Sequence, residues 1–396
     1  MISVNDAVHQ IRSAFSVVDS ESVTLKEATG RVLSNDIFAR QSQPPAPVSS
    51  MDGYAVRAAD AAKPGAKLVV VGKAPAGHPF AGSLGRGQAI RIFTGAVVPE
   101  GADAIVIQED TASDGDEVVL NVAAIRGRHI RAAGLDFKSG EVIVKAGRCL
   151  TPRDVALIAA GDVPNATVRS RPRVAFAATG DELSLPGAPR KPGGIVASSG
   201  FGLAPMIEKW GGIAIDLGIL PDTQEAVASI ADHSKSADLL VTIGGASVGE
   251  HDLVQKALGP KGFELGFWKI AMRPGKPLIF GRLGKTPLLG LPGNPVSTLV
   301  CALLFLRPAI SAMLGTPHSE NILTAKLATE LRPNDGRQDY VRARKQVRDG
   351  ELWVEPFSIQ DSSMLSALAA ADVLIARPPY AALAQVGDRV SVLSLD

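Results

Sequence analysis

Four short apolar segments in the middle of the chain each run directly into a turn rich in glycine, proline or aspartate. The segments span residues 173–178, 213–220, 239–243 and 287–291. Helical stretches alternate with them, among them Gly202 to Trp210 and a buried helix predicted from Val296 to Leu306. Strands and helices in alternation are typical of a parallel sheet with crossover helices. The sequence therefore predicts an α/β domain, to which we assign residues 170–315.

Acidic residues follow three of these predicted strands. Asp181 and Glu182 follow the first strand, Asp222 the second and Asp252 the third. In a parallel sheet, ligands bind beyond the carboxyl ends of the strands, so these carboxylates are expected to gather at one rim. Their mutual repulsion calls for a cation. Oxygen ligands without cysteine or clustered histidine favour a hard ion, and we predict Mg²⁺ bridging to a substrate phosphate.

Two neighbouring segments indicate how an anion is held. The turn after the third strand begins with Gly244-Gly245, and such glycines let backbone N–H groups approach an anion. Taken alone, this pattern also fits a tight turn without a ligand. Further along, Lys269, Arg273 and Lys276 supply positive charge. Cations beside an acidic rim suit phosphoryl or oxyanion chemistry, and a solvated basic turn is the alternative.

Two other regions flank the predicted α/β domain. Residues 1–165 combine an amphipathic first helix with short strands and glycine-rich turns, and residues 322–396 contain strand-like segments. The first region predicts a mixed α+β fold, and the second predicts a small β domain. We therefore expect an α/β multi-domain protein built around the central parallel sheet.

Charge and hydropathy exclude some classes of partner. The 396 residues carry a formal net charge of +1, which gives no electrostatic reason to expect nucleic-acid or membrane-surface binding. The N-terminus shows no secretory pattern, and the longest apolar run, Leu299 to Leu306, is far shorter than the ~20 residues that span a bilayer. Arg307-Pro308 is expected to end that helix. We expect a cytoplasmic protein without a membrane span.

Six motifs occur in order along nearly the whole chain. They are PPAPVSSMDGYA (44–55), RIFTGA (91–96), TGDEL (179–183), GGASVG (244–249), Lys276-Pro277 and LPGNP (291–295). This set resembles the molybdopterin molybdenumtransferases of the MoeA type, the family that includes the E domain of gephyrin. The run around Met51-Asp52-Gly53 and the glycine loop are each fairly specific.

The resemblance implies a fold and a set of partners. It implies an N-terminal region with a helical connector and an inserted β-rich part, then a molybdopterin-binding α/β domain and a C-terminal β barrel. It also implies a homodimer whose cleft is shared between subunits, with Asp52, Thr94 and Asp136 opposite the partner's acidic rim. Transient contact with the molybdopterin adenylyltransferase and with downstream cofactor-delivery proteins is implied as well.

The implied reaction is molybdenum insertion in molybdenum cofactor biosynthesis. Adenylyl-molybdopterin and molybdate are the substrates, hydrolysis depends on Mg²⁺, molybdate is transferred to the dithiolene, and AMP is released. The resemblance assigns catalysis to Asp52, Thr94, Asp136, Glu182, Lys269 and Arg273, and the metal to Glu182, Asp222 and Asp252. It assigns binding of pterin, phosphate or molybdate to Arg131, Thr179, Gly244, Gly245, Ser247, Gly249, Lys276, Pro292, Asn294, Pro295, Arg337 and Ser362.

Some of these residues have simpler structural interpretations. Asp52 precedes a glycine, and aspartate in that position commonly caps the backbone N–H groups of a turn. Arg131 and Asp136 could form a surface salt bridge worth ~1 kcal/mol or less. Their functional roles therefore depend on the resemblance.

The chain departs from the family pattern in two segments. His129 and Leu135 stand where relatives usually carry asparagine and glutamate, and Ala197-Ser198-Ser199 replaces an Asp-Ser-Asn or Asp-Thr-Asn run that lines the pterin site. These changes leave open a divergent paralogue that binds or carries molybdopterin without inserting metal. A second alternative is the adenylyltransferase of the preceding step, which shares the α/β domain but is usually a compact single domain.

Overall fold

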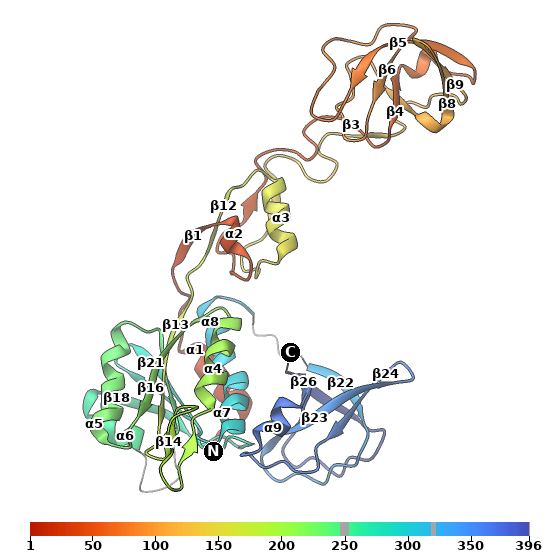
Figure 1. Cartoon of the computed structure of the whole chain (residues 1–396). Coiled ribbons are helices and arrows are strands. Elements are labelled where there is room, and N and C mark those ends of the chain that lie inside the picture. The colour runs from red at the N-terminus through yellow and green to blue at the C-terminus, as the bar shows by residue number, and fades with distance from the viewer. Residues whose placement is uncertain (246–252, 318–321, 396) are drawn as a thin grey trace. The chain divides into compact units, whose positions relative to one another are not determined.

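The computed structural model describes residues 1–245, 253–317 and 322–395, and the chain divides into two compact units (Figure 1). Unit 1 consists of Met1–Ser20 and Arg169–Asp396, and unit 2 consists of Glu21–Val168. The predicted N-terminal region of residues 1–165 thus differs from unit 2 at its start, because the first helix packs within unit 1.

The first helix, α1 (Val4–Ser13), has the amphipathic character that its sequence predicts. Its N-cap is Ser3, whose hydroxyl accepts a hydrogen bond from the Asp6 N–H at 3.1 Å. Val4, Ala7 and Ile11 are buried on one face, and the helix packs against α8 (Arg307–Met313). Burial of this apolar stripe holds a helix that is too short to be stable alone.

Unit 1 contains a six-stranded sheet in the order β16-β13-β17-β21-β20-β18. The strands are β13 (Arg173–Thr179), β16 (Ile213–Leu220), β17 (Leu239–Ile243), β18 (Phe263–Trp268), β20 (Ile279–Leu283) and β21 (Thr286–Leu291). The first four strands of that order are parallel, so the predicted α/β fold is confirmed. Strand β20 runs antiparallel to both of its neighbours, β21 and β18, which the alternation of strands and helices did not reveal.

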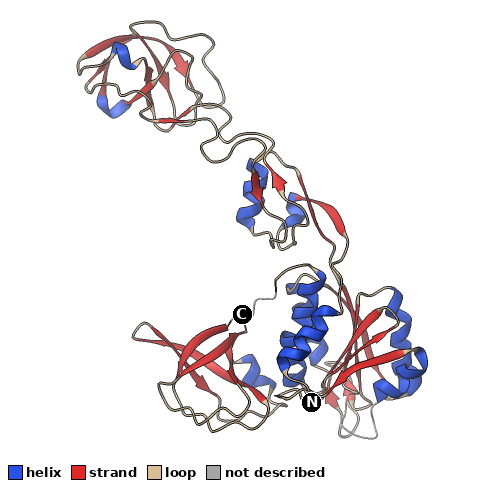
Figure 2. Ribbon diagram, turned by 180° about the vertical axis from the view of Figure 1, so that it is seen from behind, coloured by secondary structure: helices blue, strands red, loops and turns tan. Residues whose placement is uncertain are grey.

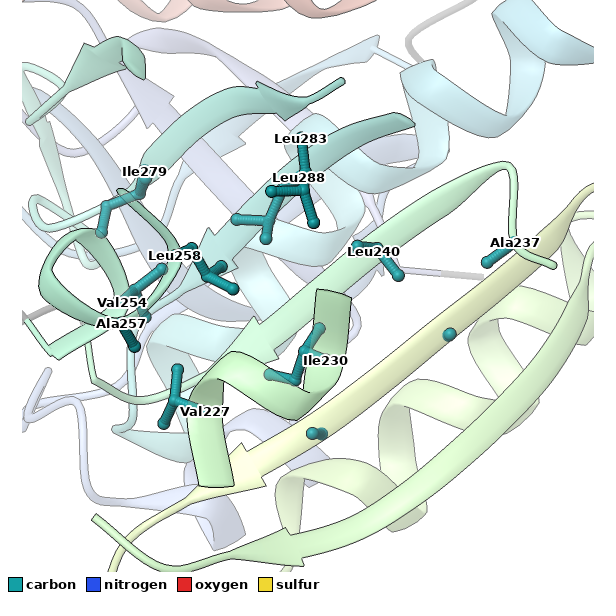
Figure 3. Close-up of a cluster of buried hydrophobic side chains, with 12 residues drawn as sticks. Val227, Ile230, Ala237, Leu240, Val254, Ala257, Leu258, Ile279, Leu283 and Leu288 are labelled. Carbon is teal, nitrogen blue, oxygen red and sulfur yellow. The ribbon is translucent and has the colours of Figure 1, made fainter. Parts of the chain in front are cut away.

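Helices cover both faces of this sheet. They are α4 (Ser199–Lys209), α5 (Gln224–Ala228), η3 (Ser229–Lys235), α6 (Leu253–Leu258), η4 (Gly259–Lys261) and α7 (Pro295–Cys301). Helices α4 and α7 lie on one face, and α5 and α6 lie on the other (Figures 1 and 2). In the core beneath α5 and α6, Val227 and Leu258 belong to the same buried cluster as Leu240 and Leu288 of the strands (Figure 3). Strands buried on both faces explain the nearly continuous apolar runs in the sequence.

The long apolar helix does not end where the sequence predicts. It continues from α7 through a π-helical stretch, η5 (Ala302–Leu306), into α8, so the predicted end at Arg307-Pro308 is wrong. Pro308 lies in the first turn of α8, directly after the π-helical segment η5. Proline has no backbone N–H, and the helix tolerates this at the junction because the hydrogen-bond spacing changes there. The helix is long and apolar enough to cross a bilayer, but 78% of its most apolar window is buried inside the protein. This pattern is also that of a core helix.

The C-terminal part of unit 1 is a closed five-stranded barrel, which confirms the predicted β domain. Its strands are β22 (Ile322–Leu327), β23 (Gln338–Arg348), β24 (Glu351–Pro356), β25 (Val373–Arg377) and β26 (Arg389–Ser394), with a short helix, α9 (Leu365–Ala369). The order is β23-β24-β22-β26-β25, and β25 pairs back onto β23. A short strand of the α/β domain, β19 (Met272–Arg273), also pairs in parallel with β23.

Unit 2 contains a β domain and a smaller mixed part. The β domain has the sheet order β7-β4-β6-β5-β9-β8, with β4 (Gly53–Val56), β5 (Ala66–Ala74), β6 (Gln88–Ile92), β7 (Ala104–Ile107), β8 (Thr111–Asp114) and β9 (Glu117–Leu120). Beside it, β3 (Val48–Ser49) pairs with β10 (Ile130–Arg131). The mixed part contains β1 (Ser20–Thr24), α2 (Leu25–Ala28), β2 (Ile37–Phe38), β11 (Val142–Val144), α3 (Pro152–Ala160) and β12 (Asn165–Arg169).

Helix α3 is stabilised by a charged cap whose effect depends on pH. Burial opposes the charge of Asp154, but hydrogen bonds from Arg148 and Thr151 and the Arg148 charge lower its pKa from 3.8 to about 2. Because the folded pKa is depressed, the stabilisation is present above pH 3.8 and is lost as the pH falls towards about 2. We expect Asp154→Ala to destabilise α3 by about 1–2 kcal/mol at neutral pH.

Hydrogen exchange of the α3 amides in the whole chain would measure this loss. Asp114→Ala, which removes an exposed carboxylate from the same unit, is the matched control and should leave α3 unchanged. Equal exchange of wild type and Asp154→Ala at neutral pH would contradict the capping role.

Candidate active site

The structure brings Asp52 and Thr94 together in unit 2. The Asp52 Oδ1 atom accepts hydrogen bonds from the Thr94 backbone N–H and from the Thr94 hydroxyl, both at 2.8 Å. These two bonds lower the pKa of the Asp52 carboxyl below its usual range, and the Arg91 charge lowers it further, although burial opposes the shift. Asp52 therefore caps the turn at Thr94, which lies 42 residues further along the chain. The sequence had suggested that Asp52 caps its own local turn.

The loops that carry these two residues are joined by backbone hydrogen bonds. The Gly95 N–H donates to the Ser49 carbonyl and the Ser49 N–H to the Ala96 carbonyl, each at 2.9 Å. On the other side, the Ser50 N–H donates to the carbonyl of His129, whose φ is 59°. Asparagine and histidine both tolerate this left-handed region of φ. His129, which stands where relatives usually carry asparagine, is therefore compatible with the backbone conformation found here.

Arg131 and Asp136 are the other predicted site residues of unit 2. Both are exposed, and neither forms a salt bridge with a described residue. The Asp136 N–H donates to the Gln43 carbonyl at 2.9 Å, which fixes the backbone and leaves the carboxylate in solvent. Leu135, where relatives usually carry an acid, is 63% exposed. The structure therefore gives no support to the surface salt bridge between Arg131 and Asp136.

Carboxylates gather at the carboxyl ends of β13 and β16 in unit 1. The Asp222 N–H donates to Asp181 Oδ1 at 3.3 Å, and a Cβ added to Gly180 would lie 2.6 Å from the Glu182 carboxylate. Burial raises the pKa of Asp222, a backbone hydrogen bond at Asp181 lowers it, and the charges of Glu182 and Asp181 raise it again. Like charges at this rim favour a bound cation. Asp252, the fourth predicted acid, lies outside the described residues.

The donor chemistry of this rim fits Mg²⁺. Glu182 and Asp222 offer only carboxylate oxygens, which are the ligands of hard cations. Among the described residues, no group of three or more acidic, histidine or cysteine side chains is arranged around a metal position. The described part thus supplies Glu182 and Asp222 as candidate ligands and does not complete the site.

A glycine turn and a buried hydroxyl adjoin this rim. Cβ atoms added to Gly244 and Gly245 would lie 3.1 and 3.2 Å from Thr179 Oγ1, so only glycine allows this approach. Thr179 is 5% exposed, and its hydroxyl finds no hydrogen-bond partner among the described residues. A buried hydroxyl without a partner costs free energy, so a ligand that bonds to it would be favoured. The predicted residues Ser247 and Gly249 lie outside the described part of the chain.

The three predicted cations near β18 and β19 differ in what they contact. The Lys269 ammonium lies 3.6 Å from the centre of the Trp268 ring, and the φ of Lys269 is 71°. Arg273 donates to both carboxylate oxygens of Asp339 in the barrel, at 2.6 and 2.7 Å. Lys276 is partly exposed, and its carbonyl accepts from the Ile270 and Leu278 N–H groups. Arg273 is therefore paired with a carboxylate of the barrel, while neither Lys269 nor Lys276 forms a salt bridge with any described residue.

The barrel reaches the α/β domain at the N-terminus of α7. The Asn294 side-chain amide donates to Ser362 Oγ at 2.8 Å, and the Val296 N–H donates to the Ser362 carbonyl. Asn294 is the N-cap of α7, Pro295 is its first residue, and the Pro292 carbonyl accepts from the buried Thr298 hydroxyl. These predicted binding residues thus form one contact region between the α/β domain and the barrel.

Arg342 is a buried residue that the sequence analysis did not single out. It is 2% exposed and donates to Gln360 Oε1 and to the carbonyls of Asp361 and Met364, so it fixes the loop that carries Ser362. The signal was available, because the alternation of strand β23 places Arg342 on the inward face with Tyr340. Arg337, the arginine that was predicted instead, forms an ion pair with Asp335 at 2.8 Å.

The pairing of Arg273 with Asp339 is expected to hold the barrel on the α/β domain. Because Arg273 is 43% exposed, Asp339→Asn should lower the free energy of unfolding by only about 1 kcal/mol. Faster hydrogen exchange of β19 and β23 would be the measured effect. Asp349→Asn, an exposed change in the same barrel, should not alter that exchange. Unchanged exchange together with weaker substrate binding would instead give Arg273 an anion-binding role.

The chain resembles known proteins over its whole length. Residues 2–161 match the MoeA N-terminal region (domain I and II), residues 175–312 match a probable molybdopterin binding domain, and residues 324–395 match the MoeA C-terminal region (domain IV). A molybdopterin molybdenumtransferase of Haemophilus influenzae is 34% identical over 94% of this chain and 93% of its own.

Further relatives agree with these matches. Molybdopterin molybdenumtransferase 2 of Mycobacterium tuberculosis is 36% identical over 81% of this chain and 82% of its own. The crystal structure of a molybdopterin biosynthesis MoeA protein from Pyrococcus horikoshii has a TM-score of 0.86 at 27% identity, covering 100% of both chains. With the order of motifs and the arrangement of domains, these similarities show that the chain belongs to the molybdopterin molybdenumtransferase family, the MoeA proteins.

Proposed function

We propose that this chain inserts molybdenum during molybdenum cofactor biosynthesis. The reaction is the Mg²⁺-dependent hydrolysis of adenylyl-molybdopterin with transfer of molybdate to the dithiolene and release of AMP. The observation that carries the proposal is the rim of unit 1, where Glu182 and Asp222 adjoin a glycine turn and the Thr179 hydroxyl, which has no hydrogen-bond partner among the described residues. This combination offers carboxylates for a cation and hydrogen-bond donors for a polar ligand in one place.

The residues divide the work by their chemistry. Glu182 and Asp222 would hold Mg²⁺, together with Asp252, and the ion when bound would neutralise the pyrophosphate and polarise its phosphorus. The Gly245 N–H and the Thr179 hydroxyl would bind the pterin substrate, and Gly244, whose N–H already donates to the Leu291 carbonyl, would let the substrate approach the backbone. The ammonium groups of Lys269, which lies over the Trp268 ring, and of Lys276 would attract molybdate or phosphate.

In unit 2, Asp52 would accept the proton of the attacking water. The Thr94 N–H and hydroxyl lower its pKa, so the carboxylate is ionised at neutral pH but is a weaker base than an unbonded carboxylate, and its role depends on its position beside the water. Thr94 would orient it, and Asp136 and Arg131, both exposed, are available to contact substrate. We assign the reaction to the cytoplasm, without nucleic acid or membrane.

We also propose that the chain acts as a homodimer whose cleft is shared between subunits. Its test is subunit mixing. Asp52→Asn and Glu182→Gln copies, each inactive alone, should together regain about one quarter of wild-type activity if the residues of one site come from different subunits. No recovery after verified exchange of subunits would contradict the shared cleft.

The first experiment is AMP release from adenylyl-molybdopterin by the purified protein with Mg²⁺, with and without molybdate. Release that depends on molybdate and leaves the metal on the pterin supports the transferase. Tight binding of the substrate without turnover would instead favour the carrier alternative, and the departures at Leu135 and Ala197 would then be its candidate cause. Formation of adenylyl-molybdopterin from ATP would favour the adenylyltransferase alternative.

A further inference from the structure

Arg91 of β6 contacts two aromatic rings and forms two hydrogen bonds next to the Asp52 loop. Its guanidinium carbon lies 5.2 Å from the centre of the Tyr54 ring and 4.9 Å from that of the Phe93 ring. Tyr54 is its directly opposed partner on β4. A planar cation that lies near two aromatic rings loses little further freedom when it also forms hydrogen bonds, so these contacts hold its direction.

The hydrogen bonds of Arg91 reach the backbone on both sides of the Asp52 loop. One Nη atom donates to the Gly53 carbonyl at 2.9 Å, and the other donates to Gln108 Oε1. The Gln108 N–H in turn donates to the Asp52 carbonyl at 3.1 Å. Arg91 therefore fixes the backbone of residues 52 and 53 directly and through one intermediate.

The residue that bonds the Asp52 carboxylate lies just beyond the end of the same strand. Thr94 follows Arg91 by three residues and donates both its N–H and its hydroxyl to Asp52 Oδ1. The Asp52 carboxylate is thus bonded by Thr94, and the Asp52 carbonyl is bonded by Gln108, which follows β7 and is itself contacted by Arg91. One carboxylate oxygen, Oδ2, is left by these bonds for a reacting group.

We propose that Arg91 is the positioning residue of Asp52, holding its backbone so that the Thr94 bonds leave Oδ2 facing the substrate. The inference rests on the proposed function, in which Asp52 is the proton acceptor. Two of the five N–H groups of Arg91 donate to the Gly53 carbonyl and to Gln108, and its guanidinium carbon lies near the Tyr54 and Phe93 rings, so these contacts hold it against the Asp52 loop. Positioning of this kind acts on turnover and not on substrate affinity.

The test compares Arg91→Gln and Arg91→Lys with the wild type and with Arg126→Gln. Arg126 is exposed and paired with Asp103, so its replacement removes the same charge from unit 2 without touching Asp52. Both Arg91 variants should lower kcat for molybdate-dependent AMP release between about 10-fold and 100-fold, with KM unchanged. The lysine variant keeps the positive charge but lacks the planar fork that donates to both the Gly53 carbonyl and Gln108. A lower kcat in this variant would therefore be caused by lost geometry and not by lost charge.

Two further readouts distinguish positioning from a general structural role. Carbon-13 NMR of the Asp52 carboxyl, identified by its absence in Asp52→Asn, should show a higher pKa in Arg91→Gln, because a cation and a fixed hydrogen-bonded loop are lost. In a double-mutant cycle, Arg91→Gln should add no further loss to Asp52→Asn.

The outcomes separate this inference from the function on which it rests. Wild-type protein without molybdate-dependent AMP release would overturn the proposed function, whatever the NMR shows. If the wild type turns over, three results would each overturn the positioning role: an unchanged kcat in both Arg91 variants, a raised KM with equal loss in the Asp52→Asn background, or an unmoved Asp52 pKa.

Discussion

Asp52→Asn is expected to lower molybdate-dependent AMP release by about 100-fold or more, because an amide cannot accept the proton of the attacking water. The fold should survive, since the asparagine Oδ1 can still accept the two hydrogen bonds that Thr94 donates to this position. The kcat of AMP release under saturating substrate, with hydrogen exchange of unit 2 as the check on folding, would measure the effect.

Asp60→Asn provides the matched control for this change. Asp60 lies in the same unit, and its carboxylate also accepts a backbone hydrogen bond, from the Gly87 N–H at 3.0 Å. A loss of activity confined to Asp52→Asn would assign the effect to the charge at that position. Full activity of Asp52→Asn would instead mean that Asp52 serves only to cap the Thr94 turn.

Gly53→Ala is expected to destabilise the β domain of unit 2 by about 3 kcal/mol, because overpacking here cannot be relieved. A Cβ at Gly53 would lie 2.1 Å from the Val106 carbonyl oxygen and 2.9 Å from the Ile107 Cα. These atoms belong to the backbone of β7, which is hydrogen-bonded to β4, so they can move only by separating the strands. Faster hydrogen exchange of the β4, β6 and β7 amides would report the loss.

Gly259→Ala is the comparison for this substitution. Gly259 has open space where a Cβ would be placed and no positive φ, so alanine there should be neutral or slightly stabilising. Equal exchange of β4 and β7 in wild type and Gly53→Ala would show that the strands separate more easily than their spacing indicates. The clash also explains why glycine follows Asp52: the chain enters the sheet between two strands immediately after the site residue.

The sequence predicted the parts of the site that depend on regular secondary structure. Asp181, Glu182 and Asp222 were expected to gather because the carboxyl ends of parallel strands share an edge, and the Asp222 to Asp181 hydrogen bond agrees with this. The same reasoning could not foresee that Arg273 is paired with Asp339, 66 residues away. That pairing depends on how the barrel packs on the α/β domain, which no local pattern records.

What the sequence determined by itself was the order of motifs, the alternating strands and helices of the α/β domain, the barrel strands and the amphipathic first helix. These follow from the periodicity of apolar residues and from turn residues, which act over short distances. Only the tertiary structure decided that this first helix belongs to unit 1, that the long helix continues past Pro308, and that Arg342 bonds to the loop that carries Ser362.

For Asp52 too, the contacts could not be read from the sequence. Only the tertiary structure decided which turn Asp52 caps and which arginine fixes its backbone. The physical reason is that these contacts join segments far apart in the chain. Their energies depend on packing and hydrogen-bond geometry that exist only after the strands have paired.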